Sequence, residues 1–420
     1  MSATFSPYLE DTFRQALQLK KIQSLVRRIS TFPDIVVFSH LRWEFVKQRP
    51  QHILSRMAKD AKVLFIEEPI GFEDDSYGTS HTISVSENVT VVQPRMNYAD
   101  WETLEDIVYC YMDQEHIQKP LLWFYSPAFV NMIDRIEHSS IVFDCMDELS
   151  AFKGASPELL KQESLLMSRA DVVFTGGKSL YDAKKDRHDF IHCFPSSVDR
   201  QHFEKAIDGD TFYYPKDLVE IPKPIAGFYG VIDERIDLQL LDEVAKQSPA
   251  VSFVMIGPVV KINPKDLPVR KNIFYLGSKS YDELPEYLQH FTVAMMPFAL
   301  NESTKFISPT KTLEFMAALK PIVSTPIYDV VRDYQDEVSV AYSAEEFSQA
   351  IIAGIQESDV EKLARVELQK AVLQRTSWSK TVASMKQLIL QSQEKSSVLD
   401  TVPSSTSFES NLAYNVAYSS

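Results

Sequence analysis

The feature that most constrains the fold of this chain is an alternation of short apolar runs with segments of helical periodicity, beginning at residue 34. The runs are rich in β-branched and aromatic residues, and several are apolar throughout. Strands have this composition when they lie in a parallel sheet covered by helices on both faces. Residues 81–93 alternate in the manner of strands, and we interpret them as an antiparallel excursion. The other strands predicted in the first half are residues 35–39, 62–66, 121–125, 141–144, 172–175 and 191–194.

A second series of strands follows a stretch rich in turn residues. Beyond Phe203 the chain passes through Asp208-Gly209-Asp210 and several prolines without a helical or strand period, so we place the domain boundary there. The sequence therefore predicts an α/β protein of two Rossmann-like, doubly wound domains, residues 31–210 and 211–375. The strands predicted in the second domain are residues 225–229, 251–256, 273–276, 293–296 and 321–325.

The two ends of the chain differ in character from these domains. Residues 1–30 form a predicted helical extension, in which apolar residues between 13 and 29 share one stripe beside lysines and arginines. We interpret the stripe as packing on the first domain. Peripheral contact with the inner face of the membrane is the alternative hypothesis. Residues 393–420 are rich in Ser and Thr, which predicts a disordered tail.

Charge and composition exclude several classes of protein. The formal net charge of −15 argues against a nucleic-acid-binding protein, because phosphate neutralisation requires clustered lysine and arginine. Cys110, Cys145 and Cys193 are widely spaced and odd in number, so neither a disulfide framework nor a thiolate metal site is predicted. Neither a signal peptide nor a membrane-spanning apolar run is recognisable. We therefore expect a cytoplasmic protein that acts on small molecules.

Glycine is scarce, with 11 residues in the chain, yet Gly230, Gly257 and Gly277 each follow a predicted strand of the second domain. Ligands of open α/β sheets bind at the carboxyl ends of the strands, where a missing side chain lets the backbone approach a phosphate. We therefore include Gly230 among the candidates for binding a phosphate-containing donor molecule. The alternative is that the three glycines form ordinary turns.

The most informative stretch begins at Ser308 and is predicted to form a loop, a helix and a buried strand in succession. Ser308 suits the N-cap and Pro309 the first helical position. The free N–H groups of such a helix start form an anion site, and a lysine in the first turn favours a bound phosphate. The alternatives are a solvated lysine and a glutamate that compensates the helix dipole. The donor-binding candidates of this stretch are Ser308, Pro309, Thr310, Lys311, Thr312 and Glu314.

Polar and aromatic side chains gather after the first predicted strand. His40 and Trp43 follow that strand, and Arg49, Gln51 and His52 lie in the next predicted helix. Such side chains stack on sugars and form hydrogen bonds with them, so we predict that these five residues bind a sugar, which under the family resemblance given below is the acceptor. For single His and Trp residues the alternative is packing in the core.

In order and spacing these motifs resemble the retaining GT-B glycosyltransferases, whose nucleotide-sugar enzymes carry a Glu-x7-Glu motif, and in particular the subgroup with Ser-Pro-x-Lys-x-x-Glu at this place. The resemblance covers roughly residues 34–390. It implies two domains that face one another across a cleft, and a C-terminal helix, residues 376–392, that crosses back onto the first domain. Further matching segments are residues 194–199, 272–277, 282–288 and 293–297, and Trp378 at the start of that helix.

The resemblance also implies roles for single residues. Glu314 matches the second glutamate of the motif, which binds the donor ribose, whereas Phe306 stands eight residues upstream in place of the first. Arg235 matches an arginine that grips the diphosphate, unless it pairs with a neighbouring acid instead. Met146 occupies the place of a histidine that contacts the transferred sugar. We expect Asp147 to take over a sugar hydroxyl, and the alternative is a turn or a helix cap.

The function that the resemblance implies is transfer of a hexose-type sugar from a nucleotide sugar, UDP- or GDP-linked, to a saccharide or lipid-linked acceptor with retention of configuration. Asp147, Lys311 and Arg235 are the predicted catalytic residues, and Lys311 and Arg235 stabilise charge on the leaving phosphate. The alternatives are a nucleotide-sugar epimerase or phosphorylase of the same fold, and a noncatalytic sugar-binding or partner subunit, which Phe306 favours.

We expect neither a metal nor a cofactor. Asp208-Gly209-Asp210 formally matches the Asp-x-Asp of metal-dependent transferases, but it lies in the predicted linker and we interpret it as a turn. Fixed donors at the helix start and Arg235 supply positive charge without a metal ion. We therefore predict activity that survives EDTA.

Overall fold

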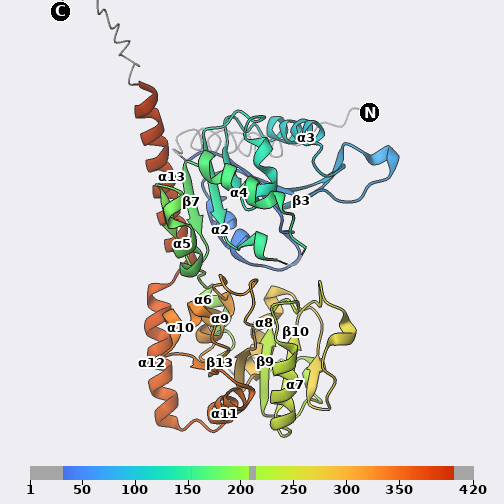
Figure 1. The fold of residues 1–420 in the computed structure, drawn as a ribbon, viewed down its shortest axis with the longest axis vertical. Coiled ribbons are helices and arrows are strands. Elements are labelled where there is room, and N and C mark those ends of the chain that lie inside the picture. The colour runs from blue at the N-terminus through green and yellow to red at the C-terminus, as the bar shows by residue number, and fades with distance from the viewer. Residues whose placement is uncertain (1–31, 153, 208–213, 402–420) are drawn as a thin grey trace, which may run out of the picture.

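The computed structural model describes residues 32–152, 154–207 and 214–401, which form two lobes placed one above the other (Figure 1). The predicted N-terminal extension with its apolar stripe, the turn at residues 208–210 and the last part of the predicted tail lie outside the described residues. Within the described residues, no helix is long and apolar enough to cross a membrane.

The first lobe is built on an eight-stranded sheet. Its strands are β1 (Ile35–Ser39), β2 (Val63–Glu67), β3 (Thr79–Ser86), β4 (Val89–Arg95), β5 (Leu121–Phe124), β6 (Ser140–Cys145), β7 (Val172–Thr175) and β8 (Ile191–Cys193). The spatial order is β3-β4-β2-β1-β5-β6-β7-β8. All neighbours are parallel except β3 and β4, which are antiparallel. The predicted parallel sheet and its antiparallel excursion are thus confirmed.

Helices cover both faces of this sheet. They are α2 (Arg49–Met57), α3 (Trp101–Gln114), α4 (Glu158–Arg169) and α5 (Lys178–Lys184). Side chains alternate along β1, so that Val36 and Phe38 pack in the core with α3, α4 and α5, whereas Ile35 and Val37 pack with α2 on the other face. Burial on both faces explains why the strand is apolar throughout.

The second lobe is built on a six-stranded parallel sheet. Its strands are β9 (Ile225–Tyr229), β10 (Ser252–Ile256), β11 (Ile273–Tyr275), β12 (Val293–Met296), β13 (Ile322–Ser324) and β14 (Ser339–Val340). The order β11-β10-β9-β12-β13-β14 reverses its direction at β9. Ligands of doubly wound sheets bind at such a reversal.

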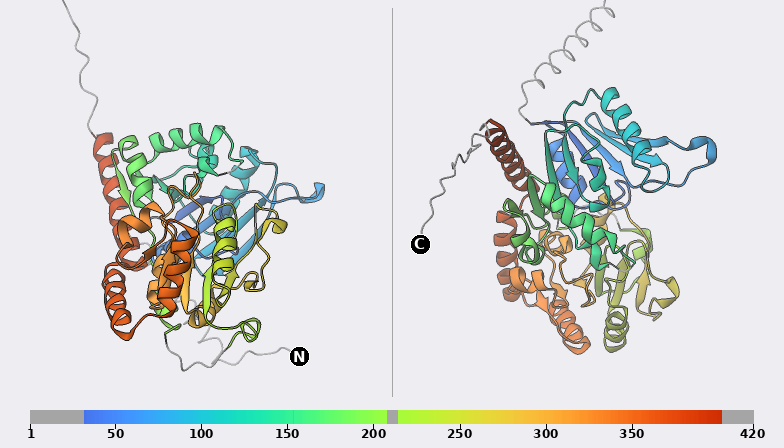
Figure 2. Two further views of the ribbon diagram at one scale, coloured as in Figure 1. Left: turned by 60° about the horizontal axis from the view of Figure 1, so that its bottom comes forward. Right: turned by 45° about the horizontal axis from the view of Figure 1, so that its top comes forward.

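The helices of the second lobe surround this sheet (Figure 2). They are α6 (Arg200–Glu204), α7 (Leu238–Gln247), α8 (Leu284–His290), α9 (Thr310–Ala317), α10 (Tyr328–Tyr334), α11 (Ala344–Ile355) and α12 (Asp359–Arg375). Val198, Phe203 and Ala206 already belong to the core of this lobe. Because these side chains pack in the second lobe, the second lobe begins before the predicted boundary at residue 210.

The last helix, α13 (Trp378–Thr401), returns to the first lobe, along whose side it runs in Figure 1. Trp378, Val382, Met385 and Ile389 lie in the core on the α2 face of the first sheet. The predicted crossing helix is thus present. It extends to Thr401, so helical structure reaches into the region that the sequence analysis predicted to be disordered.

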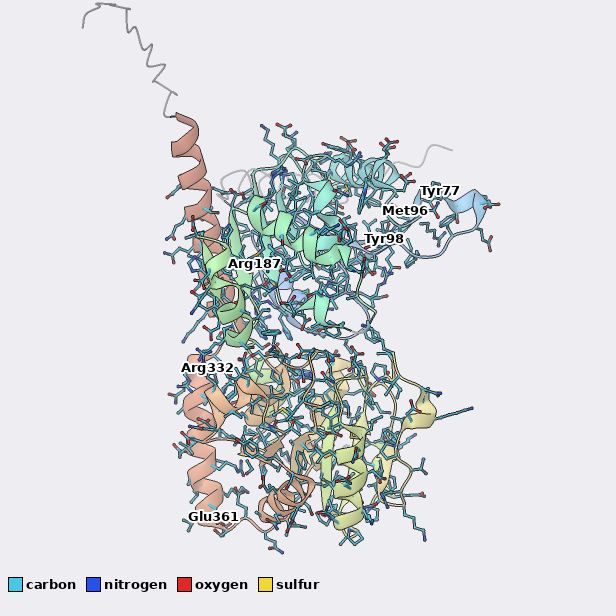
Figure 3. All side chains as sticks on the ribbon, in the orientation of Figure 1. Tyr77, Met96, Tyr98, Arg187, Arg332 and Glu361 are labelled. Carbon is cyan, nitrogen blue, oxygen red and sulfur yellow. The ribbon has the colours of Figure 1, made fainter. Side chains whose placement is uncertain are left out.

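The two lobes are also joined between α5 and α10. The carboxylate of Asp329 accepts hydrogen bonds from the backbone N–H groups of Lys178, at 3.1 Å, and Ser179, at 3.0 Å. It thereby caps the start of α5, where the N-cap residue is a glycine without a side chain. Arg332, labelled in Figure 3, pairs with Asp182 at 2.6 Å across the same boundary. These contacts fix the separation of the lobes beside the cleft.

Candidate functional site

A cavity of about 400 Å³ lies in the cleft between the two lobes. The first lobe contributes the loop after β1, the ends of β6 and β7, and Ser196. The second lobe contributes the loops after β9, β10 and β11 and the start of α9. The carboxyl ends of strands from both sheets therefore face the same space, as the two-domain prediction required.

Two of the three glycines predicted to follow strands of the second domain line this cavity. Gly230 follows β9 with φ +153°, and Gly257 follows β10 with φ +145°. A Cβ on Gly257 would lie 1.8 Å from the carbonyl oxygen of Gly230. The backbones therefore approach each other more closely than any side chain allows. Gly277, the third predicted glycine, follows β11 and its carbonyl accepts a hydrogen bond from Gly257 at 2.9 Å, but only Gly230 and Gly257 line the cavity.

Helix α9 begins one residue later than predicted. Pro309 is the N-cap and Thr310 the first helical residue, so the prediction that Ser308 caps the helix is wrong. Ser308 instead accepts a hydrogen bond at its carbonyl oxygen from the hydroxyl of Ser196, at 3.2 Å. Ser308, Pro309, Thr310 and Lys311 all line the cavity. The helix start is therefore tied to the first lobe and faces the cleft.

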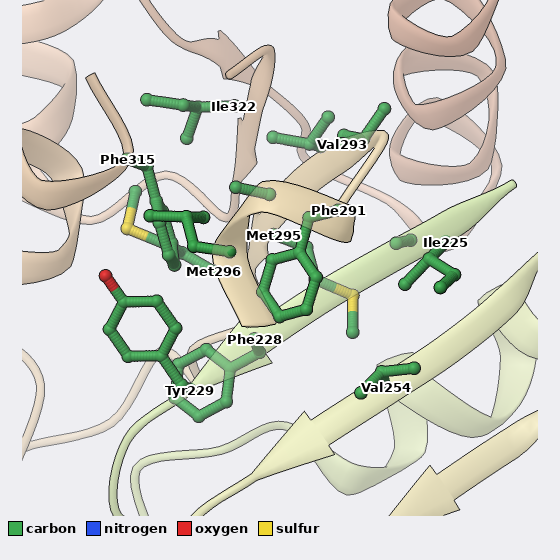
Figure 4. Close-up of a cluster of buried hydrophobic side chains, with 14 of the residues drawn as sticks. Ile225, Phe228, Tyr229, Val254, Phe291, Val293, Met295, Met296, Phe315 and Ile322 are labelled. Carbon is green, nitrogen blue, oxygen red and sulfur yellow. The ribbon is translucent and has the colours of Figure 1, made fainter. Parts of the chain in front are cut away.

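Lys311 is the cation nearest the helix start, and it lies above a buried carboxylate. Its ammonium is 3.0 Å from Oε2 of Glu314, which is 2% exposed. The same ammonium lies 5.1 Å from the ring centroid of Tyr229, which packs against Phe315 in the core shown in Figure 4. Burial and the neighbouring Glu314 raise the pKa of Tyr229 well above its usual value. The phenol is therefore neutral at physiological pH.

Two donor-binding candidates do not line the cavity. Thr312 is fully buried, and its hydroxyl lies 3.5 Å from the sulfur of Met296, so it belongs to the core between α9 and β12. Successive residues of an α-helix are about 100° apart, so Thr312 lies on another face of α9 than the cleft-lining residues before it. Glu314 lies behind Lys311, and the cavity reaches Lys311 but not the glutamate.

Arg235 lines the cavity and is held by a buried acid. Its Nε lies 2.9 Å from Oδ1 of Asp233 and its terminal nitrogen lies 2.7 Å from Oδ2. The backbone N–H of Arg235 also donates to Asp233 at 3.0 Å, and Asp233 is 3% exposed. The pair with a neighbouring acid, which the sequence analysis gave as an alternative, is thus present. The planar guanidinium fixed in this way still borders the cleft.

Asp147 follows β6 on the opposite wall of the cavity, beside Met146. Burial raises the pKa of Asp147, whereas the nearby guanidinium groups of Arg235 and Arg49 act in the opposite direction. Asp147 and Arg235 therefore face the same part of the cleft from different lobes. A carboxyl group and a guanidinium placed in this way can orient a polar ligand between them.

Three acceptor candidates have structural roles instead. Arg49 is 3% exposed and grips the fully buried Asp144 through Nε, at 3.0 Å, and a terminal nitrogen, at 2.8 Å. Gln51 is 4% exposed, and its amide donates to the carbonyl oxygen of Trp43 at 2.8 Å. His52 stacks on Trp378 of α13 with ring centroids 5.1 Å apart. Arg49 touches the cavity, but Gln51 and His52 do not line it.

The other two acceptor candidates border cavities. Trp43 lines the cleft, although the residue is only 9% exposed and its ring packs on Phe65. His40 lines a second cavity of about 590 Å³, which adjoins the first. Burial, with a contribution from Lys261, lowers the pKa of His40 to about 4, so the imidazole is neutral near pH 7.

The sequence analysis missed two segments of the site. Residues 44–48 of the first lobe and residues 278–281 of the second line the cleft from opposite sides. They meet where the ammonium of Lys47 lies 4.3 Å from the ring centroid of Tyr281. Neither segment has a local motif, and they come together only because the two lobes dock.

The described residues contain no group of three or more His, Cys, Asp or Glu side chains arranged to hold a metal ion. The polar groups at the cavity include backbone N–H groups at the start of α9 and the cations Lys311 and Arg235, with Asp147 on the opposite wall. Such a set offers donors and positive charge to an anion. It therefore suits a phosphate-containing ligand.

Comparison of the sequence with known proteins gives two matches. Residues 223–357 match the family described as Glycosyl transferases group 1. Over 223 residues the chain is 23% identical to TuaH of Bacillus subtilis (strain 168), a glycosyltransferase named for teichuronic acid biosynthesis. The match covers 49% of this chain and 55% of TuaH, so the chain spans about half the length of this curated relative.

Solved structures match nearly the whole chain. Sucrose-phosphate synthase from Thermosynechococcus elongatus has a TM-score of 0.64 at 13% identity, over 86% of this chain and 98% of its own. An α,α-trehalose-phosphate synthase (UDP-forming) from Burkholderia vietnamiensis has the same score and identity, over 88% and 99%. Anabaena HepE, in complex with UDP and glucose, has a TM-score of 0.57 at 14% identity, over 88% and 100%. The fold is therefore GT-B-like, with two Rossmann-like domains.

Proposed function

We propose that this protein is a glycosyltransferase that moves a hexose-type sugar from a UDP- or GDP-linked donor to a saccharide or lipid-linked acceptor, without a metal ion and with retention of configuration. The observation that carries the proposal is the cavity at the carboxyl ends of both sheets, where the start of α9, Lys311 and Arg235 converge. The match of residues 223–357 to the group 1 glycosyl transferases supports it, because these residues include β9 to β13 and α9.

The donor diphosphate binds at the start of α9 in this proposal. Backbone N–H groups there point toward the cleft and carry the positive end of the helix dipole. Gly230 and Gly257 let the phosphates approach the backbone, since neither presents a side chain. Lys311 moves its ammonium from Glu314 to the phosphate, and the carboxylate that it leaves accepts hydrogen bonds from the ribose hydroxyls. The ion pair at 3.0 Å is thus the resting state of the donor site.

The chemistry is electrostatic stabilisation of the leaving group. As the bond between the anomeric carbon and the diphosphate oxygen breaks, negative charge grows on the phosphate. Arg235 and the helix start border this region, and Lys311 joins them when the donor binds, so these groups need no further reorganisation in the transition state. Asp147, on the opposite wall, accepts a hydrogen bond from a hydroxyl of the transferred sugar. The proposal needs no metal, because these groups supply the positive charge.

Comparisons bear on the donor and the acceptor. The solved HepE structure holds UDP and glucose in the same fold, which supports a nucleotide sugar as donor. The name of TuaH connects a relative of this chain with synthesis of a polysaccharide. We therefore propose a role in polysaccharide biosynthesis in the cytoplasm, with acceptor chains that are free or lipid-linked.

A noncatalytic sugar-binding subunit is the second candidate, and Phe306 favours it. This residue stands where the first glutamate of the family motif is expected. Its ring is half-buried, packs against the core of the first lobe and lies 5.4 Å from the ammonium of Lys305. A contact to the donor sugar from this position would be apolar, so turnover must be measured as well as binding.

A thermal-shift screen separates these possibilities at the level of binding. The purified protein is heated with UDP, GDP, ADP and TDP and their common sugar derivatives, with and without EDTA. We expect one nucleotide series to raise the midpoint, insensitive to EDTA, because a ligand that binds only the native state stabilises it by mass action. The shift should be absent in Lys311→Ala and kept in Lys265→Ala, a control on the loop after β10. No shift with any nucleotide at millimolar concentration would contradict the donor site.

A further inference from the structure

The second cavity adjoins the donor cavity and shares lining residues with it. Its volume is about 590 Å³. Both cavities are lined by Asp147 and Arg235, and by the loop that contains Phe45, Val46 and Gln48. They therefore meet at the groups assigned to the leaving phosphate and the transferred sugar. A molecule in the second cavity could present an atom to the anomeric carbon of a donor in the first.

Much of the wall of the second cavity is apolar. Leu149, Phe152, Ala155 and Leu159 come from the segment that follows β6, and Val260 comes from the second lobe. At the rim, Tyr98 is 60% exposed and is labelled in Figure 3 on the side of the first lobe. An apolar wall of this extent removes carbon-rich surface of a ligand from water.

The charges of the described lining are mainly acidic. Asp233 is neutralised by Arg235, with oxygen and nitrogen 2.7 Å apart, and Glu158 pairs at the surface with Lys161 at 2.9 Å. Glu68 and Asp147 then remain beside the single ammonium of Lys261. Burial raises the pKa of both Glu68 and Asp147, although cations beside each of them act in the opposite direction. With two carboxyl groups beside one ammonium, the lining favours an uncharged ligand over an anion.

His40 offers a neutral partner to an uncharged hydroxyl. Its Nδ1 is buried and has no hydrogen-bond partner among the described residues. The residue lies directly after β1, at the wall of the second cavity. Burial keeps the imidazole neutral near pH 7, so His40 adds a polar but uncharged side chain to the lining. A neutral imidazole can donate to a hydroxyl or accept from one.

We propose that the second cavity is the acceptor subsite and that it selects an uncharged saccharide with an apolar aglycone over an anionic saccharide such as a uronate or a sugar phosphate. This proposal rests on the proposed function. In the reaction, the acceptor oxygen forms a bond to the anomeric carbon while the bond from that carbon to the diphosphate oxygen breaks. The electron pair stays with the diphosphate, which takes up the proton of the acceptor hydroxyl.

Matched acceptors test the charge preference. The protein is incubated with its donor and either p-nitrophenyl glucoside or p-nitrophenyl glucuronide, and with the corresponding galactoside and galacturonide, and products are measured by mass spectrometry. We expect kcat/KM to be higher for the neutral member of each pair. We also expect kcat/KM to be higher for p-nitrophenyl glycosides than for methyl glycosides. Glu68→Gln should raise the relative use of the anionic member by about fivefold or more, because it removes a nearby charge in a partly screened cleft. Glu87→Gln, an exposed control on the far β3–β4 turn, should not.

A cavity-filling variant tests the location. Ala155 lines the second cavity but not the first, so Ala155→Trp should abolish acceptor use while the nucleotide thermal shift stays intact. If Ala155→Trp does not fold, the ratio of neutral to anionic acceptor use in Glu68→Gln tests the proposal instead. Preferential use of uronides, or an unchanged ratio in Glu68→Gln, would overturn the proposal. If nucleotides bind but saturation-transfer NMR detects no neutral glycoside bound in the presence of nucleoside diphosphate, the acceptor proposal fails alone. Loss of nucleotide binding in the wild type would instead refute the proposed function.

Discussion

Lys311 and Glu314 form the pair whose perturbation is most informative, because one of them faces the cleft and the other is buried. The side chain of Lys311 is 22% exposed and that of Glu314 is 3% exposed. Lys311→Ala leaves a buried carboxylate without its cation. Breaking a fully buried pair costs about 3–5 kcal/mol, and the partial exposure of Lys311 reduces the expected loss to about 2 kcal/mol.

The double variant separates stability from catalysis. Lys311→Ala/Glu314→Gln removes both charges, so we expect it to recover at least about 1 kcal/mol of the unfolding free energy that Lys311→Ala loses. Turnover should not recover, because the leaving phosphate still lacks its cation. Removal of one such group typically lowers kcat about 100-fold or more.

Urea unfolding and steady-state kinetics measure the two effects on the same preparations. The expected pattern is low stability and low turnover in Lys311→Ala, with restored stability and low turnover in the double variant. The reasoning is refuted if the double variant regains wild-type turnover, or if Lys311→Ala keeps it. Either outcome would mean that Lys311 acts only as a structural partner of Glu314.

Three further predictions concern other parts of the molecule. Asp233→Asn weakens the ion pair that holds Arg235, so kcat should fall about tenfold with a smaller change in donor KM. Steady-state kinetics measures both constants, and a kcat equal to that of the wild type would contradict a positioning role for Asp233. Burial, and to a smaller extent the charge of Lys47, lowers the pKa of His52 from 6.5 to about 3. Between these pH values the unfolded chain binds more protons than the folded protein, so the unfolding free energy falls as the pH drops. His52→Phe should reduce the loss between pH 7 and pH 4 by about 3 kcal/mol in urea titrations at both pH values, whereas parallel curves would refute this. Asp329→Ala should speed amide exchange at residues 178 and 179, measured by deuterium uptake, and cost about 1 kcal/mol; unchanged exchange would show that the cap across the lobes is dispensable.

The strands could be predicted because their signal is local. β1, β7, β9 and β12 have the predicted boundaries, and all four are fully buried. A fully buried strand must be apolar at every position, so the pattern is continuous and its ends are sharp. The predicted start of α9 was wrong by one residue, because Pro309 can serve either as N-cap or as the first helical residue. In the structure Pro309 is the N-cap, and Ser308 before it accepts a hydrogen bond from Ser196 of the first lobe.

The polar residues of the first lobe could not be assigned from the sequence. Arg49 finds its partner Asp144 at a sequence separation of 95 residues, and His52 stacks on Trp378 of the returning helix. In the sequence both residues have the chemistry of sugar-binding groups. Only the tertiary structure shows that they satisfy buried partners instead.

Most of the second cavity could not be predicted from the sequence either, apart from His40, Asp147 and Arg235. Lys261, Phe152 and Glu68 lie in three separate connecting segments, and the ammonium of Lys261 comes within 5.1 Å of the Phe152 ring centroid only where the lobes meet. Loops that share a site without a shared motif give no periodic signal. Lys311 and Glu314 could be recognised because both lie in one local motif, Lys311 in the first turn of the predicted helix and Glu314 at the second glutamate of the family motif.

The most direct test of the account is release of nucleoside diphosphate from the sugar donor identified by thermal shift, in EDTA and with a mixture of neutral glycoside acceptors. The account predicts continuous release with formation of a glycoside that retains the anomeric configuration of the donor, reduced about 100-fold or more in Lys311→Ala/Glu314→Gln. Donor binding without release by the wild type, across the whole acceptor panel, would contradict it and assign the cleft to a noncatalytic subunit.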